Sequence, residues 1–421
     1  MKEFIIKYNN RITYFFLIAL SFFPVLPMGI ESALMMVVFL FSFSYFVLEG
    51  NKFWNHQKGL YGLLFSSLLL IYTFSLLYTQ NYSNGIKYIT KLLPTVLFPA
   101  LFLFNDKELI SLKQLQFLKT TYVIALILVL GYLHFSLFGA LYKSNLQFWD
   151  FRQLIEKKIR VHGTYLSMWV GFGVILLLLR IKHEILNKQK QCTNIGLLAV
   201  IGYFIYWQYL IGARMPFGAT LLLSSFLVFK NKKQMFVFSM LFVIAGFIMV
   251  LKMDRLGDRY KKLMDYNFSF PVGKYEDNYQ NISTEQIRNG LYYCGFEKIT
   301  LAPLLGYGIG DVDAELQSCL ETTFTNTDTY KIANYNSHNQ YLKIILSVGF
   351  IGFLLFFISI WYLIREAIKA KSGLFIVFIF YVFLNFCFEN ILSRHDGVLF
   401  FSFFSALFFF TNLKRNEKSI N

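Results

Sequence analysis

The sequence SHNQYLKIILSVGFIGFLLFFISIWYL, residues 337–363, places a short polar segment directly before a long apolar run. That run is long enough to cross a bilayer as a helix, which needs about 20 mostly apolar residues. Similar runs recur along the 421-residue chain, which is 56% hydrophobic, 19% aromatic and only 15% charged. A typical soluble domain has about 25% charged residues. The composition therefore excludes a soluble enzyme, a disordered tail and a nucleic-acid-binding protein, and it predicts a polytopic membrane protein.

We predict an all-α fold with about twelve transmembrane helices. The first two are separated only by Gly29-Ile30-Glu31, and the eighth has Pro216 in its first turn, where proline is tolerated. The expected spans cover residues 12–29, 32–48, 59–78, 86–104, 120–140, 163–180, 195–212, 215–229, 235–251, 340–363, 373–390 and 397–412.

The distribution of basic residues predicts the orientation of the chain. Of the 40 Lys and Arg residues, 21 lie on one set of alternating short segments, whereas the opposite short turns carry only Arg214 and Arg394. Short cytoplasmic loops are enriched in Lys and Arg. Both termini are therefore expected in the cytoplasm, with the protein in the bacterial inner membrane.

Two outer segments are too long to be simple turns, and they divide the chain into three parts. Residues 1–251 form a bundle of nine spans with an outer loop at 141–162, residues 252–337 form a large periplasmic loop, and residues 338–421 form three final spans. Loops of such length are usually functional or disordered.

The large loop is expected to contain short helices. Ser283 and Gln286 form a capping-box pattern, and Pro303 is expected to end the helix that follows. Cys294 and Cys319 share this oxidising compartment, and a disulfide and two unrelated thiols remain equally open alternatives.

His338 stands where the large loop re-enters the membrane. A histidine at such a helix mouth can act as a general base near neutral pH. The alternative is an interfacial histidine that only begins the span. Gly349 and Gly352 follow on the same helix and would allow close packing against a neighbouring helix.

This stretch resembles the signature of bacterial O-antigen ligases and O-antigen polymerases. In that family a histidine is followed by Asn, Ser or Gln, then nine residues, a glycine, two residues and another small residue. His338, Asn339, Gly349 and Gly352 fit the pattern.

Two further segments resemble the same family. The stretch from Arg288 to Asp311 has an arginine on a short helix and then Pro303-Leu304-Leu305-Gly306-Tyr307-Gly308. Gly212-Ala213-Arg214 places an arginine at the outer mouth between two spans. The layout of twelve spans with a large loop before the histidine also resembles the family.

The resemblance implies a glycosyltransferase that moves a glycan from an undecaprenyl diphosphate carrier to a hydroxyl acceptor. His338 would activate the acceptor hydroxyl, while Arg214 and Arg288 would neutralise the departing diphosphate, because guanidinium groups bind phosphate in bidentate fashion. Arg160 and Asn339 are expected to contribute to substrate binding. The alternatives are snorkelling to the headgroups for Arg214, a solvated helix face for Arg288 and a plain interfacial cation for Arg160.

The expected partners are the lipid-linked oligosaccharide, membrane lipids and an acceptor that is lipid A-core, another glycan or a protein. No nucleic acid, metal or other cofactor is expected, since His, Cys and carboxylates do not cluster at metal-ligand spacing. A polysaccharide flippase or other transporter is the rival class, and a non-catalytic scaffold is a third. Transporters typically show paired halves and ionisable residues near mid-membrane, whereas this chain places its polar residues outside.

Overall fold

The computed structural model describes residues 2–50, 54–105, 109–142, 148–186, 191–228, 284–324 and 335–420. Within these ranges every regular element is a helix, which confirms the all-α class. Among the described residues, six helical stretches are long and apolar enough to cross a membrane, with Tyr82–Leu103 counted as one stretch. The bent pair His56–Phe65 and Ser67–Ser75 raises this to seven if it counts as one span. The total of about twelve spans stays a prediction, and the expected span at 235–251 lies outside the described residues.

The elements in chain order are α1 (Lys2–Ser21), α2 (Met28–Glu49), α3 (His56–Phe65), α4 (Ser67–Ser75), α5 (Tyr82–Leu92), α6 (Pro94–Leu103), α7 (Leu112–Ser136), α8 (Phe138–Tyr142), α9 (Phe148–Ile159), α10 (Gly163–Leu186), α11 (Gln191–Ile211), α12 (Arg214–Val228), α15 (Thr284–Leu301), α16 (Val312–Thr323), α18 (Gln340–Lys369), α19 (Gly373–Phe386), the 3-10 helix η3 (Ile391–Ser393) and α20 (His395–Ile420).

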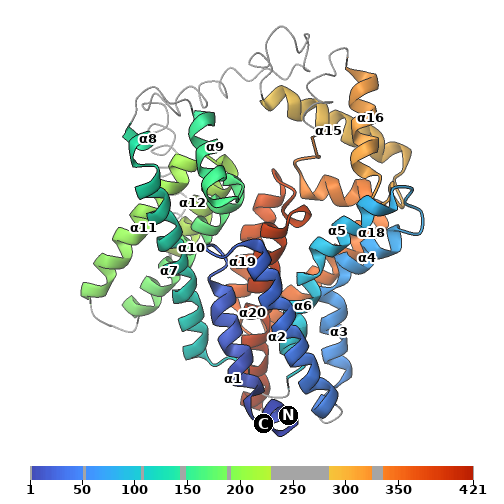
Figure 1. The fold of residues 1–421 in the computed structure, drawn as a ribbon. Coiled ribbons are helices and arrows are strands. Elements are labelled where there is room, and N and C mark those ends of the chain that lie inside the picture. Colours follow the sequence, from blue (N-terminus) through green and yellow to red (C-terminus); the bar gives the residue numbers. More distant parts are fainter. Residues whose placement is uncertain are drawn as a thin grey trace.

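Figure 1 shows how these helices are arranged. α1, α2, α19 and α20 lie in the middle, α7 to α12 on one side, and α3 to α6 with α18 on the other. The start of α1 and the end of α20 lie at one end of the bundle, and α15 and α16 lie at the opposite end, which we call the distal face. Whether this face is periplasmic stays a prediction.

Proline residues explain two of the helix ends. α1 ends at Ser21 and α2 begins at Met28 with Pro27 as its N-cap. The expected boundary at residues 29–31 was therefore wrong, because Pro24 and Pro27 lack the backbone N–H that a continuing helix needs. Similarly, Pro94 starts α6 directly after α5.

α3 and α4 meet at an angle of 61° at Ser66.

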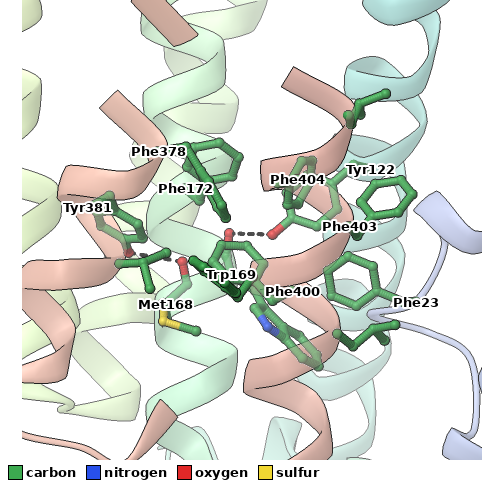
Figure 2. Packing of buried hydrophobic residues seen from close by; sticks show 14 of the residues in the cluster. Phe23, Tyr122, Met168, Trp169, Phe172, Phe378, Tyr381, Phe400, Phe403 and Phe404 are labelled. Carbon is green, nitrogen blue, oxygen red and sulfur yellow. Dashed lines mark hydrogen bonds between the residues drawn. The ribbon is translucent and has the colours of Figure 1, made fainter. Parts of the chain in front are cut away.

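The centre of the bundle is packed with aromatic rings from helices far apart in sequence (Figure 2). Tyr122 of α7 contacts Phe404 of α20 edge to face, with ring centroids 4.8 Å apart. Its buried hydroxyl donates to the Trp169 carbonyl at 2.9 Å, and the Tyr381 hydroxyl donates to the Met168 carbonyl at the same distance. The hydroxyls of these two tyrosines are thus satisfied although their rings are buried.

α15 and α16 form a small lobe on the distal face, together with their connection at 302–311. Ile287 and Leu291 share the buried face of α15 and pack with Leu316 and Leu320 of α16. Cys294 and Cys319 form a disulfide between the two helices, which settles the alternative that the sequence left open. In the chain-entropy model, closing a loop of this length stabilises the fold by roughly 3 kcal/mol. The expected capping residue Ser283 lies outside the described residues.

Two aspartates of the lobe fix it to the bundle. The Asp311 carboxylate accepts hydrogen bonds from the backbone amides of Gln80 and Asn81, at 2.6 and 2.7 Å, just before α5. Asp313 forms an ion pair with Lys343 of α18, with Nζ 2.5 Å from Oδ1, and accepts a hydrogen bond from Tyr88. The Lys343 side chain is only 1% exposed. This pair therefore joins the lobe to α18, and the burial of Lys343 reduces the screening of its charge by water.

Breaking this ion pair should destabilise the protein strongly. Asp313→Asn leaves the Lys343 ammonium buried without a counter-charge, and a change of this kind costs about 3 kcal/mol or more. We expect a clearly lower melting temperature for the purified protein in detergent. Asp313→Asn combined with Lys343→Met should lose less stability than the two single changes summed. Lys369→Met, which removes a half-exposed pair with Glu366, serves as the control and should have little effect.

Candidate active site

The helix that follows His338 is broken at Gly349, whose φ of 63° and ψ of −173° are non-helical. The break would leave backbone groups unpaired in an apolar setting. Strand-like hydrogen bonds from the lobe connection replace the missing ones. The amides of Tyr307 and Gly308 donate to the carbonyls of Leu346 and Ser347. The amides of Phe350 and Ile351 donate to the carbonyls of Pro303 and Leu304, at 2.8 and 3.3 Å. Irregular backbone is tolerated at membrane depth only when protein satisfies it in this way.

The glycines at this junction are required by space and by backbone conformation. A Cβ on Gly349 would lie 2.1 Å from the Leu304 carbonyl oxygen, and one on Gly306 would lie 2.5 Å from that of Leu346. Both residues have positive φ. The expected helix-packing role therefore suits Gly352, where a Cβ would lie 3.0 Å from Ile71 of α4, but not Gly349.

The segment before α18 holds His338 in a strained turn. His338 has φ of 44°, in the left-handed region that costs a non-glycine residue of order 1 kcal/mol or more. Its amide donates to the Asn336 side chain at 3.0 Å. Asn339 caps α18 by accepting from the Leu342 amide, and its own amide group donates to the Cys387 carbonyl. The turn therefore fixes the backbone that carries the imidazole.

A second turn, residues 387–394 between α19 and α20, is bonded to the His338 turn along its length. Ser337 Oγ lies 3.2 Å from Asn390 Oδ1, and the Leu392 amide donates to the Gln340 side chain at 2.7 Å. Tyr165 of α10 donates to the Asn390 carbonyl. These contacts connect three separate parts of the chain into one rigid unit on the distal face.

Glu389 is the carboxylate that faces His338. Its Oε2 lies 3.9 Å from His338 Nδ1, and its side chain is 8% exposed. Burial alone would raise the pKa of Glu389, but its interaction with His338 and the nearby Arg394 charge lower the pKa to about 2. Glu389 therefore stays ionised at neutral pH beside the imidazole. Sequence reasoning missed it, because its only signal was an acidic residue in a short turn after an apolar run.

The turn between α9 and α10 adjoins this pair. Glu156 accepts from Arg152 Nε at 3.0 Å and from the Gly163 amide at 2.8 Å, and it lies 3.8 Å from His162 Nε2. Burial and the Arg152 charge lower the pKa of His162 to about 4. His162 is therefore neutral near pH 7 and is not a fixed cation of the site.

The predicted arginines occupy different positions around this unit. Arg288 lies with its guanidinium carbon 5.9 Å from the centre of the Phe388 ring, next to Glu389. Its Nε atom is buried and has no hydrogen-bond partner among the described residues. Arg288 is thus brought to the His338 site.

Arg214 and Arg160 sit on two neighbouring turns. Arg214 begins α12 after Gly212, which has φ of 63°. Arg160 ends α9 with φ of 57°, and its side chain is exposed. A Cβ on Gly163 would lie 3.2 Å from Ile211, so the two turns are close together. The described contacts that lead to the His338 turn run instead through Arg288 and through the turn at residues 387–394.

Together these features define a helical membrane protein whose polar chemistry is gathered on one face, around a histidine, a buried carboxylate and several arginines. The family model described as O-Antigen ligase matches residues 196–357, which include Arg214, Arg288, His338 and Gly349. This match over residues 196–357 supports the O-antigen ligase and polymerase superfamily, in agreement with the sequence resemblance. No curated protein matches the chain.

Gly349→Ala should disrupt the junction between α18 and the lobe. The added Cβ would strike the Leu304 backbone, and alanine does not adopt this φ without strain. We expect loss of folded protein or a much lower melting temperature, measured on the purified protein. Gly131→Ala, at a site in α7 where a Cβ meets nothing within 4 Å, should leave stability unchanged or slightly higher. Equal melting temperatures for both variants would contradict the role given to Gly349.

Proposed function

We propose that the protein is a glycosyltransferase that moves a glycan from an undecaprenyl diphosphate carrier to a hydroxyl acceptor. The observation that carries this proposal is the His338–Glu389 pair with Arg288 beside it. His338 and Arg288 lie inside the segment that matches the O-antigen ligase family, and Glu389 lies beyond its end. A base and phosphate-binding cations at one place are what such a transfer needs.

In the proposed reaction the acceptor oxygen forms a bond to the anomeric carbon as the bond from that carbon to the diphosphate oxygen breaks. His338 takes the proton of the acceptor hydroxyl. The diphosphate leaves with the bonding electrons, and Arg288 and Arg214 stabilise its charge. Glu389 stabilises the imidazolium that forms, because it is already ionised and buried nearby. Arg160 and Asn339 are proposed to support substrate binding.

The carrier, the acceptor and the compartment belong to this proposal. Lipid A-core, another glycan or a protein would each offer a suitable hydroxyl. The cation asymmetry of the short loops supports placing the distal face on the periplasmic side of the inner membrane, with both termini cytoplasmic. The proposal also includes the division of the chain into three parts, with boundaries after residues 251 and 337.

The direct test is transfer by the purified protein in detergent, using an undecaprenyl-diphosphate oligosaccharide and candidate acceptors. Covalent product should form in a single phase without a membrane. A flippase or other transporter moves its cargo between two compartments and would make no new glycosidic bond. Absence of product with every acceptor class, from folded protein, would contradict the proposed function.

His338→Ala should retain at most a few per cent of activity, because a general base contributes typically 10²–10⁴-fold to rate. Wild-type activity should fall as the pH is lowered from about 8 to about 5, because a protonated imidazole cannot accept the hydroxyl proton. Glu389 and His162 do not explain such a fall, since the pKa of Glu389 is about 2 and that of His162 about 4. Initial rates across this pH range measure the effect.

Asn339→Ala is the control for this experiment. The Asn339 side chain caps α18 and donates a hydrogen bond to the Cys387 carbonyl, but it cannot act as a base. Its loss should reduce stability by about 1 kcal/mol and should keep the acidic fall in rate. Near wild-type transfer by a folded His338→Ala protein would rule out the general-base role.

Arg288→Lys and Arg214→Lys should both impair turnover although the charge is kept, because lysine does not form the bidentate contact to phosphate. Arg160→Lys should be tolerated better, since that side chain is exposed at the end of α9. Rates are compared at matched amounts of folded protein. Full activity of both Arg288→Lys and Arg214→Lys would exclude diphosphate binding by these residues.

A further inference from the structure

Arg394 is a cation of the distal face that the proposed reaction has not yet used. It ends η3 in an extended conformation, with φ of −124° and ψ of 146°. Its carbonyl accepts a hydrogen bond from the Val398 amide in the first turn of α20. The backbone of Arg394 is therefore fixed by two helices, while its side chain is exposed.

The turn that carries Arg394 is the same one that carries Glu389. This turn is bonded to the His338 segment through Asn390 and through the Leu392 amide. The Arg394 charge helps lower the pKa of Glu389, so the guanidinium is within electrostatic reach of the carboxylate that faces His338. Arg394 therefore belongs spatially to the candidate active site.

No carboxylate lies within 4 Å of the Arg394 guanidinium in the described ranges. A cation that only supports the fold would be expected in a fixed pair with such a carboxylate. Arg394 is instead exposed, and its charge acts on Glu389 and on Asp396 without a salt bridge to either.

The orientation of the chain makes this cation more informative. Short outer turns carry only two basic residues, Arg214 and Arg394, against 21 on the opposite set. Cations on that side work against the preferred insertion of the chain. Arg214 has a role in the proposed reaction. The presence of Arg394 on the same side therefore indicates that it too has a role in the reaction.

We propose that Arg394 is a further phosphate-binding residue that grips the carrier diphosphate together with Arg288. Arg288 lies against Phe388, one residue before Glu389, and Arg394 lies five residues after it. Arg288 therefore reaches this turn from α15, whereas Arg394 stands on the turn itself, directly after η3. A diphosphate offers two phosphoryl groups, so each guanidinium has its own pair of oxygens to bind. This inference rests on the proposed function.

The test measures binding of undecaprenyl diphosphate without sugar, compared with undecaprenol, to the purified protein in detergent. Arg394→Gln should weaken binding of the diphosphate about tenfold or more, since hydrogen bonds to charged groups are worth about 1.5–3 kcal/mol. Undecaprenol binding should stay unchanged. Arg394→Lys should fall between the two, because it keeps the charge and loses the fork. In transfer assays the KM for the donor should rise while that for the acceptor should not.

Arg365→Gln is the matched control, an exposed arginine at the far end of α18. Unchanged diphosphate binding in Arg394→Gln would overturn the inference. Equal weakening of diphosphate and undecaprenol would show a merely structural role, and a rise in the acceptor KM alone would place Arg394 in the acceptor site; both outcomes also overturn it. Absence of transfer by the wild type would count against the proposed function, while the binding measurement would still decide the role of Arg394.

Discussion

The position of the candidate active site depends on one break in a membrane helix. α18 runs from Gln340 to Lys369, and at 1.5 Å per residue the part after Gly349 is about 30 Å long, enough for the hydrocarbon core. The part before the break is a separate short helix that carries His338 at its start. Because backbone hydrogen bonds from residues 303–308 fill the break, the lobe and the histidine are held in one arrangement. Without that pairing, unpaired amides and carbonyls would make the break too costly.

The electrostatics of the site follow from the same crowding of turns. Glu389 is nearly buried, and burial disfavours its charged form. The interaction with His338 and the Arg394 charge reverse this effect, so the Glu389 carboxylate is ionised at neutral pH. His162, close by, is neutral at that pH. One fixed negative charge next to one imidazole is an arrangement that favours proton transfer to that imidazole. This arrangement depends on the positions of the two turns that carry His338 and Glu389.

Local patterns in the sequence predicted the class of fold and several of the site residues. Apolar runs predict helices, because a membrane-spanning segment has to satisfy its own backbone hydrogen bonds. The arginine and histidine motifs pointed to Arg288 and His338, which the structure brings to the same turn. The partner of His338 was not predictable in this way, since Glu389 lies 51 positions further along and is brought close only by the packing of α18 against α19. The break at Gly349 was also missed, because its hydrogen bonds come from residues more than 40 positions earlier in the chain. The start of α2 after Pro27 was predictable in principle from the proline. The prediction followed the apolar run that continues across Pro27 instead, and so placed the boundary too late.

The aromatic core contributes to the site from below. Tyr165 is fully buried in the first turn of α10, and its hydroxyl reaches the Asn390 carbonyl in the turn that carries Glu389. A Cβ on Gly397 would lie 2.7 Å from the Tyr165 ring and 2.0 Å from the Ile391 carbonyl oxygen, so α20 packs closely beneath that turn. Both α10 and α20 continue directly into the ring cluster of Figure 2. The geometry around His338 is therefore determined largely by helices that carry none of the proposed catalytic residues. A close-packed interior transmits displacements instead of absorbing them. A shift of α10 or α20 would therefore also move the turns that carry the proposed catalytic residues.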